Sequence, residues 1–345
     1  MNLSQTLALL RALSRFLARL SLAAAQILAL GIIMWLGLRL YPGDRWLAVR
    51  LGSYFAPWLL VALLPALAIT LLARRRGWTG VVLLLILLLG SRYWPLFDPT
   101  PAAIGAERPA SELRVMTFNV HYANRRDGDI AHLIAAEQPD LVAFQELSDE
   151  LGGALLPQLA ADYPYQWVDD SWGLSTALIS RYPLESQPKP PAAARVQPAR
   201  LATPAGKIAV WNVHPPTAID DRGWAVQRRM LAAVAEAVEA DQGPVIVLGD
   251  FNTTPDAENY ALLGKRLTNV HYAVGRGFGF TFPETDLLAR LPWYAQPFRV
   301  LGPLVRIDHI LVSQHFAPLE THAVADGLGS DHRPVVATLR LAATR

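Results

Sequence analysis

The chain has 345 residues, enough for one large domain and a further module. Hydrophobic residues make up 52% of it and the mean hydropathy is +0.24, values that are high for a wholly soluble enzyme and indicate that part of the chain lies in lipid. The absence of cysteine excludes disulfides, zinc–thiolate sites and thiol nucleophiles.

Charge is distributed unevenly along the chain. The first 110 residues carry 11 arginines and no lysine against three acidic residues, a net charge of +8, whereas the remainder has a net charge of −6. Arginines beside apolar stretches are expected to face anionic lipid head groups. The acidic remainder argues against a broad cationic surface for the backbone of DNA or RNA.

Three apolar stretches occupy the first 100 residues, at about Phe16–Leu38, Tyr54–Leu72 and Trp78–Phe97. Each is close to the roughly 20 residues that an α-helix needs to cross a ~30 Å hydrocarbon core. We therefore predict a membrane anchor of about three transmembrane helices over residues 1–97. A cleaved signal peptide is the alternative for the first stretch, and it would leave the other two as the anchor.

Basic residues predict the orientation of these helices. Arg11, Arg15 and Arg19 precede or begin the first stretch and Arg74–Arg76 separate the second from the third, so both groups are expected in the cytoplasm. Three crossings then place the rest of the chain outside an inner or plasma membrane. If the third stretch does not span, the remainder faces the cytoplasm instead.

The segment 98–110 is rich in proline and alanine and is predicted to be a linker. Beyond it, short β-like runs alternate with helical ones, which predicts α/β layers in a domain over residues 111–345. The expected strands are Leu113–Val120, Leu141–Gln145, Ser175–Ser180, Lys207–Val213, Val245–Leu248, Ile307–Val312 and Val335–Leu339, and the expected helices are Ile130–Glu137 and Gly223–Ala240.

Polar residues recur at the ends of these otherwise apolar strands. They are Asn119 and His121 in VMTFNVHY, Gln145 and Glu146 in LVAFQE, His214 in IAVWNVH, Asp250 and Asn252 in VIVLGDFN, Asp308 in DHILV, and Asp331 and His332 in GSDHRP. Hydrolytic metal sites need carboxylates on rigid strand ends that converge on one ion. Oxygen and imidazole ligands without cysteine favour Mg²⁺ or Mn²⁺ over structural zinc.

The segments TFNV, FQE, NVH, GDFN, RIDHI and GSDHRP occur in this order within residues 113–341. With them the chain resembles the endonuclease/exonuclease/phosphatase superfamily, which includes pancreatic-type deoxyribonucleases, abasic-site endonucleases, neutral sphingomyelinases and inositol polyphosphate phosphatases. Each segment alone is a weak signal, but their combination in order is specific. The resemblance implies a four-layered α/β sandwich, two packed mixed sheets flanked by helices, that hydrolyses phosphoesters with a divalent metal. The anchor lies outside the resemblance.

The same resemblance implies the metal ligands. Glu146 resembles the principal metal carboxylate, with Asn119 beside it, and Asp331 resembles a further metal-associated aspartate. His121 stands where an aspartate or asparagine is often found, and we leave open whether it binds the metal or only lines the pocket.

Catalytic roles follow by position in the same way. Asp250 resembles the residue that orients or deprotonates the attacking water, or protonates the leaving oxygen, and Asn252 would hold Asp250 and the phosphoryl group. His332 resembles the histidine that contacts the phosphate, with Asp308 as its partner, and His214 resembles a second histidine of the deoxyribonuclease and sphingomyelinase branches. An aspartate bonded to one imidazole nitrogen fixes the tautomer and favours the imidazolium, a good donor to phosphate.

These observations predict a membrane-anchored phosphodiester hydrolase that uses metal-assisted water attack. A lipid head group, a small phosphoester and nucleic acid all remain open as the substrate, and the oligomeric state is open too. Trp172, Trp224 and Trp293 could stack on bases, and four loop arginines could bind substrate charge: Arg125, Arg126, Arg222 and Arg276. The alternative is a tethered, inactive binding domain of the same fold.

Overall fold

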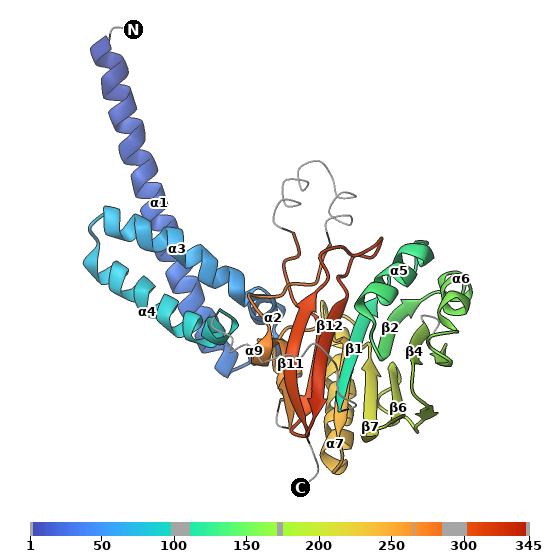
Figure 1. Ribbon diagram of the computed structural model, residues 1–345. Helices are drawn as coiled ribbons and strands as arrows, with labels where there is room; N and C mark the ends of the chain where they lie inside the picture. Colours follow the sequence, from blue (N-terminus) through green and yellow to red (C-terminus); the bar gives the residue numbers. More distant parts are fainter. Residues whose placement is uncertain (1–2, 98–110, 171–174, 265, 285–301, 343–345) are drawn as a thin grey trace. The chain divides into compact units, whose positions relative to one another are not determined.

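A computed structural model describes residues 3–97, 111–170, 175–264, 266–284 and 302–342 (Figure 1). The predicted linker 98–110 and the residues Trp172 and Trp293 lie outside the described residues. The chain divides into two compact units, Met1–Trp94 and Pro95–Arg345. Each unit is described by itself.

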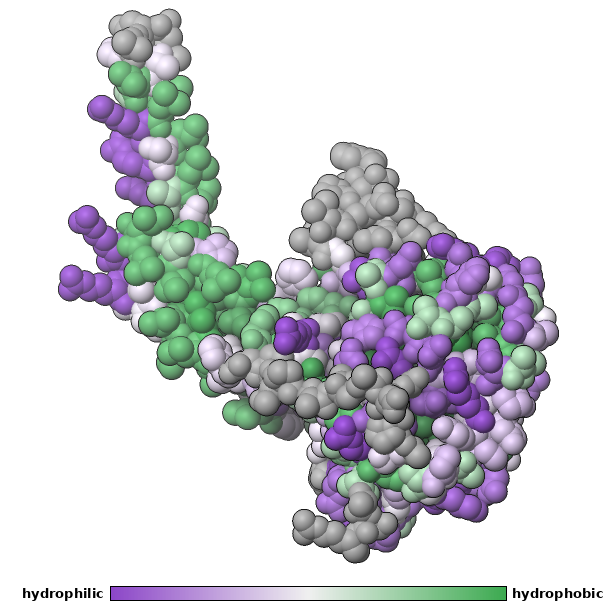
Figure 2. Space-filling view, in the orientation of Figure 1, coloured by the Kyte–Doolittle hydropathy of each residue, from purple (hydrophilic) through white to green (hydrophobic). Residues whose placement is uncertain are grey.

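The N-terminal unit is helical because its sequence is apolar over nearly every turn. Its elements are α1 (Leu3–Leu40), the 3₁₀ turn η1 (Gly43–Arg45), α2 (Leu47–Tyr54), α3 (Ala56–Leu72) and α4 (Arg76–Tyr93), and the 3₁₀ turn η2 (Trp94–Leu96) follows. Small and branched side chains of α1, α3 and α4 form its core, among them Ala29, Leu63 and Val82. Apolar side chains also cover much of the outer surface of these helices (Figure 2).

Two helical segments of this unit are long and apolar enough to cross a membrane, Ser4–Leu40 and Arg76–Leu96. The helices α2 and α3 would form a third candidate span, but they are bent by 76° at Phe55. The second predicted stretch is therefore one arm of a broken helix pair. The unit offers two candidate spans, or three if the bent pair is one span.

The first sheet of the C-terminal unit, sheet A, has six strands. In spatial order they are β11 (Phe316–Ala323), β12 (Val335–Leu341), β1 (Glu112–Asn119), β2 (Leu141–Leu147), β4 (Ser175–Ser180) and β3 (Tyr165–Asp169). Strands β1 and β2 are parallel and every other pair is antiparallel. The parallel pair is joined through α5 (Asp127–Glu137), which packs with α6 (Asp149–Leu159) beside β2 (Figure 1).

Sheet B also has six strands and one parallel pair, β7–β8. Its order is β5 (Leu184–Ser186), β6 (Val196–Thr203), β7 (Gly206–Val213), β8 (Val245–Asp250), β10 (Asp308–Ser313) and β9 (Leu267–Asn269). The long helix α7 (Asp221–Ala240) connects β7 to β8 and begins at Asp220, whose carboxylate accepts the Gly223 N–H at 2.6 Å. Two short helices follow, α8 (Glu258–Ala261) and α9 (Val270–Val274).

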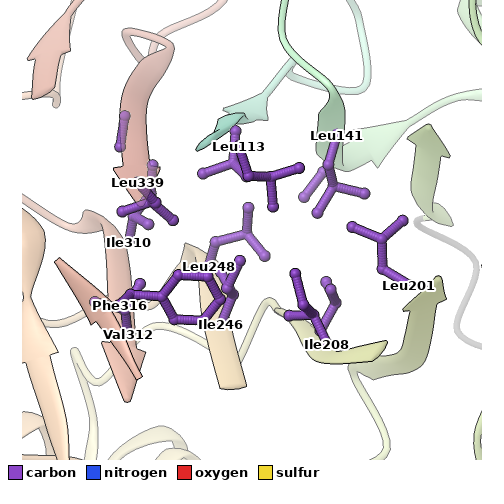
Figure 3. Close-up of a cluster of buried hydrophobic side chains, with 14 of the residues drawn as sticks. Leu113, Leu141, Leu201, Ile208, Ile246, Leu248, Ile310, Val312, Phe316 and Leu339 are labelled. Carbon is purple, nitrogen blue, oxygen red and sulfur yellow. The ribbon is translucent and has the colours of Figure 1, made fainter. Parts of the chain in front are cut away.

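The two sheets pack face to face over an apolar core. Alternate residues of each strand point into it, such as Leu113 of β1 and Ile246 and Leu248 of β8 (Figure 3). The intervening residues point outward: Met116 and Phe118 pack beneath α5 and α6, and residues of sheet B pack beneath α7. The predicted four-layered α/β sandwich of two mixed sheets flanked by helices is confirmed.

All nine elements expected after residue 111 exist, whereas several others were not predicted. Strands β6 and β11 were not predicted because each contains a proline, Pro198 and Pro318. Proline in a sequence argues against the interior of a strand. In the structure β11 is an edge strand with an irregular register at Pro318. Strands β5 and β9 have only three residues, too few for a period to be recognised.

Candidate active site

The inward-facing residues of the central strands change character along each strand. They begin as apolar core, pass through a layer of buried polar residues, and end in charged or polar groups at one end of the sandwich. The polar layer consists of Thr117, Gln145, Gln197 and Asn212, and the residues that follow it on the same face are Asn119, Arg195, His214, Asp250 and Asp308. The site is thus the continuation of the core stripe rather than a separate structure.

Strand register brings three of these residues into one row across sheet B. Val213 lies opposite Gly249 in the parallel pair, so His214 lies beside Asp250, and Asp250 lies opposite Asp308 in the next pair. A Cβ on Gly249, whose φ is +145°, would lie 2.0 Å from the Val213 carbonyl oxygen. Only glycine therefore fits immediately before Asp250.

Sheet A supplies Asn119 at the end of β1 and Glu146 near the end of β2. The Asn119 side-chain Nδ2 donates to Glu146 Oε1 at 3.2 Å and to Asp250 Oδ2 at 3.0 Å. It thereby joins a carboxylate of each sheet. Glu146 lies at a register irregularity of β2, which turns its side chain to the same end of the sandwich.

Backbone strain is concentrated at this end. Six non-glycine residues of the described chain have positive φ, and three of them are His121 (62°), Glu146 (56°) and Asn252 (49°). Such conformations cost on the order of 1–3 kcal/mol each and persist where the surroundings over-determine them. The His121 ring contacts Tyr122 at a tilt of 39° with ring centroids 4.6 Å apart, and its backbone N–H donates to Asn119 Oδ1 at 3.1 Å.

Asp250 is the most heavily hydrogen-bonded carboxylate of the cluster. Besides Asn119, the backbone N–H of Asn252 donates to Oδ1 at 2.8 Å, and the Asn252 side chain donates to Oδ2 at 3.2 Å. Burial raises the pKa of Asp250 to about 7, and Asp308 acts in the same direction, although His332 and Asn252 oppose the shift. Asp250 can therefore exchange a proton near neutral pH.

His332 and Asp308 form a direct pair. His332 Nδ1 lies 3.0 Å from Asp308 Oδ2, and Nε2 lies 3.8 Å from Asp250 Oδ2. The Phe282 ring packs against the imidazole with centroids 4.8 Å apart. Burial by itself would lower the pKa of His332, but the charges of Asp308 and Asp250 outweigh it and raise the pKa to about 10. His332 is therefore an imidazolium at neutral pH.

His214, unlike His332, is uncharged at neutral pH. Its Nε2 lies 3.6 Å from both Glu146 Oε1 and Asp250 Oδ2. Burial lowers the pKa of His214 to about 4, with Glu146 opposing and Arg195 reinforcing the shift. The site therefore holds one neutral and one protonated histidine on either side of Asp250.

Asp331 lies apart from the hydrogen-bonded cluster. It is half-buried, its carboxylate makes no hydrogen bond or ion pair within the described chain, and its charge contributes to the raised pKa of His332. The contacts therefore unite seven of the eight predicted residues: Asn119, Glu146, His214, Asp250, Asn252, Asp308 and His332.

The donor set suits a hard divalent cation, because it is rich in carboxylate oxygen. Ligand atoms of Asp250, Asp308 and His332 lie within 4.8 Å of one another and form one group that could hold an ion. However, His332 Nδ1 is already engaged by Asp308. The predicted ligands Glu146, Asn119 and Asp331 form the alternative set. As oriented, Asn119 presents its NH₂ to the carboxylates, and the reversed amide would present its oxygen.

Ser330 is a site residue that the sequence analysis missed. Its hydroxyl donates to the Asn119 carbonyl oxygen at 2.6 Å and accepts the His332 backbone N–H at 3.0 Å. It thus ties the end of β1 to the loop that carries His332. The signal was present in GSDHRP, where a serine two residues before the histidine can form such a turn.

The buried amide layer beneath the site was missed as well. Asn212 accepts from Gln145 Nε2 at 2.7 Å and donates to Gln197 Oε1 at 3.1 Å and to the Phe144 carbonyl oxygen at 3.0 Å. All three amide side chains are fully buried. The network links the two sheets beneath the site, through residues that lie next to Glu146 on β2 and two residues before His214 on β7.

The loop arginines considered for substrate recognition have different surroundings. Arg125 pairs with Glu150 at 2.7 Å and Arg126 with Asp129 at 2.6 Å, so nearby acids neutralise both. Arg222 is exposed at the start of α7. Trp224 is half-buried, and the Arg228 guanidinium lies over its ring.

The sequence and the fold were compared with those of known proteins. The model of the Endonuclease/Exonuclease/phosphatase family matches residues 116–332. A search of curated proteins found no match. Among solved structures, an endonuclease/exonuclease/phosphatase from Beutenbergia cavernae DSM 12333 is similar, with 22% identity, coverage of 67% of this chain and 72% of that chain, and a TM-score of 0.50.

Two further structures share the fold. One is the endonuclease/exonuclease/phosphatase from Bacteroides vulgatus, with 20% identity, coverage of 67% of this chain and 99% of that chain, and a TM-score of 0.52. The other is D. rerio TDP2 complexed with a single-strand DNA product, with 17% identity, the same coverage and a TM-score of 0.54. The family match runs from TFNV to His332 and so includes all eight predicted site residues, and the chain belongs to the Endonuclease/Exonuclease/phosphatase family.

Proposed function

We propose that this protein is a membrane-anchored, divalent-metal-dependent phosphoester hydrolase that acts by direct attack of water, without a covalent intermediate. The observation that carries the proposal is the convergence of seven polar side chains, from distant segments, into one buried cluster around Asp250. Family membership supports the reaction class, since the cluster is built from the segments that the family model covers.

Asp250 is assigned the proton transfer from the attacking water. Its raised pKa lets it accept a proton near neutral pH, and Asn252 and Asn119 hold the carboxylate in one orientation. His332, protonated and held through Nδ1 by Asp308, donates from Nε2 to a phosphoryl oxygen. Neutral His214 lies on the other side of Asp250, where its Nε2 would donate a hydrogen bond to a second phosphoryl oxygen of the substrate.

Glu146, Asn119 and Asp331 are assigned the divalent metal, Mg²⁺ or Mn²⁺. Glu146 presents a carboxylate that is 18% exposed, and the half-buried Asp331 is near enough to contribute to the raised pKa of His332; carboxylate oxygen suits a hard cation. When bound there, the cation would neutralise charge on the phosphoryl oxygens in the transition state.

The helices of residues 1–97 are assigned to a membrane anchor, followed by a linker over 98–110 and a catalytic domain over 111–345. The arginines before and between the candidate spans support an extracytoplasmic catalytic domain at an inner or plasma membrane. Protease treatment of intact spheroplasts should cut this domain. Protection in spheroplasts, with cleavage only after lysis, would place it in the cytoplasm.

Lipid head groups and other small phosphoesters are the substrates that a membrane tether favours. Nucleic acid is the competing class. It is supported by the fold shared with D. rerio TDP2, which was solved with a single-strand DNA product, and opposed by the net charge of −6 after residue 110.

The test uses the full-length protein in detergent micelles. It should hydrolyse bis-p-nitrophenyl phosphate with Mg²⁺ or Mn²⁺, stop with EDTA and recover when metal is restored. Arg266→Gln is a control variant that should keep the activity of the wild type, because Arg266 is exposed next to β9, at the end of sheet B away from the cluster. Plasmid DNA, sphingomyelin, phosphatidylinositol and inositol phosphates are then compared. No turnover of any of them would favour the inactive binding domain.

A further inference from the structure

Arg195 extends the row of site residues by one strand. It immediately precedes β6, and because Val196 lies opposite Val213, Arg195 lies opposite His214. The His214 backbone N–H donates to the Arg195 carbonyl oxygen at 3.0 Å. Directly opposed residues of an antiparallel pair point to the same face of a sheet with Cα atoms about 5.5 Å apart. Arg195 therefore flanks His214 on the side away from Asp250.

The guanidinium of Arg195 has no partner among the described residues. It is half-buried, yet its side chain makes no hydrogen bond and no ion pair within that part of the chain. Two other half-buried cations of this unit have counterions: Lys189 pairs with Asp169, and Arg333 pairs with Glu284. Within the described chain, the guanidinium N–H donors of Arg195 are therefore left for solvent or for an anionic ligand, with which they would form charge-assisted hydrogen bonds.

A small hollow at this end of the unit is lined by Asp169, Thr176, Lys189, Arg195, Val196 and His214. His214 is therefore shared between the hollow and the catalytic cluster. The hollow itself has room for about one water molecule, so a larger group would be held at its mouth, adjacent to a phosphoester at Asp250.

We propose that Arg195 binds a second phosphate of the substrate, next to the phosphoester that is cleaved. The proposal rests on the hydrolase function proposed above and narrows its substrates to those that carry more than one phosphate. A guanidinium presents paired N–H donors that match two phosphate oxygens, and its charge is permanent. Two sources supply this chemistry, a phosphorylated lipid head group and the neighbouring phosphate of a nucleic acid strand.

Two matched pairs of substrates separate these sources. For nucleic acid, the p-nitrophenyl ester of thymidine 5′-phosphate is compared with the same ester bearing a 3′-phosphate. For lipid, phosphatidylinositol is compared with phosphatidylinositol bisphosphate. The full-length protein in detergent, Arg195→Gln, Arg195→Lys and the control Arg266→Gln are assayed for kcat/KM on each substrate.

The wild type should prefer the member with the additional phosphates in one pair by about tenfold or more. Arg195→Gln should abolish most of this preference through KM, Arg195→Lys should retain part of it, and Arg266→Gln should retain all of it. A wild type without preference, or a preference that survives in Arg195→Gln, would overturn the proposal. Equal losses on both members of a pair would also overturn it, because they indicate a structural role.

A binding measurement distinguishes this proposal from the hydrolase proposal. Titration calorimetry with thymidine 3′,5′-bisphosphate and inositol bisphosphate should give affinities that Arg195→Gln weakens about tenfold or more, and the monophosphates should be affected less. If binding behaves in this way without turnover, the hydrolase function fails and Arg195 keeps its assignment. If turnover occurs and Arg195→Gln binds both classes like the wild type, only the Arg195 assignment fails.

Discussion

The two sheets contribute unlike halves to one site. Sheet B places His214, Asp250 and Asp308 in a regular row, and these residues are only 5%, 1% and 0% exposed. Sheet A places Glu146 at a register irregularity with left-handed backbone, and its side chain is 18% exposed. Burial lowers the pKa of His214, which keeps it neutral, and raises the pKa of Asp250 to about 7, which suits Asp250 to proton transfer. The more open carboxylate of sheet A is suited to take an ion from solvent.

The strongest test of this division replaces the carboxylate at the centre of the row. Asp250→Asn is nearly isosteric but removes the proton acceptor, so kcat on bis-p-nitrophenyl phosphate should fall by about 10³-fold or more. The metal concentration for half-maximal activity should stay near that of the wild type. A loss below about tenfold would remove Asp250 from the proton transfer.

Replacing the open carboxylate should give a different kinetic signature. Glu146→Gln should lower kcat by about 10²-fold and raise the Mg²⁺ or Mn²⁺ concentration for half-maximal activity by about tenfold or more. Titration of activity with each metal measures both. If this variant instead keeps the metal dependence of the wild type, the ion is held by Asp250, Asp308 and His332 rather than by sheet A.

Removing the partner of His332 should have a smaller, pH-dependent effect. Asp308 contributes to the raised pKa of His332, so Asp308→Asn lowers that pKa and the imidazolium is lost at lower pH. The variant should lose about tenfold in kcat at neutral pH and more as the pH rises. The pH–rate profile should therefore bend downward at a lower pH on its alkaline side. A profile parallel to that of the wild type would contradict this role.

The buried amide network between the two sheets can be tested by measuring the stability of the fold. Asn212→Leu removes the amide that links the sheets and leaves the amide of Gln145 without the nearest of its acceptors. The free energy of unfolding should fall by about 2–3 kcal/mol. Denaturant unfolding of the full-length protein measures this loss. The control Gln158→Leu, at an exposed position on α6, should change it by less than about 0.5 kcal/mol.

The smallest effect is expected at Glu137, at the end of α5 on the outer side of sheet A. Burial would raise its pKa, but hydrogen bonds from Arg114 and His322 outweigh burial and lower it. Glu137 therefore stabilises the fold above its unfolded pKa, and this contribution is lost as the pH falls through the lower native value. Glu137→Gln should cost about 1 kcal/mol at neutral pH.

The measurement is the melting temperature of wild type and variant from neutral pH downward. The difference between them should close as the pH falls below the ordinary glutamate value, because both side chains are then uncharged. A difference that is independent of pH would show that packing, rather than charge, accounts for it.

Much of the site was predictable because its residues are adjacent to strands whose apolar composition is plain. TFNV, FQE and GDFN each combine a buried strand with the polar residue that ends it. Ser330, Asn212 and Arg195 were not predicted to take part. A serine in a loop, an asparagine in a strand and an arginine before an unrecognised strand have no distinguishing local pattern.

The amino-acid sequence by itself determined the apolar helices, the alternating strands and the family membership, because these depend on local periodicity and on short segments in order. Only the tertiary structure decided the strand register, and with it the row formed by Arg195, His214, Asp250 and Asp308. Register depends on contacts between segments far apart in the chain, and burial decides which histidine is neutral and which is charged.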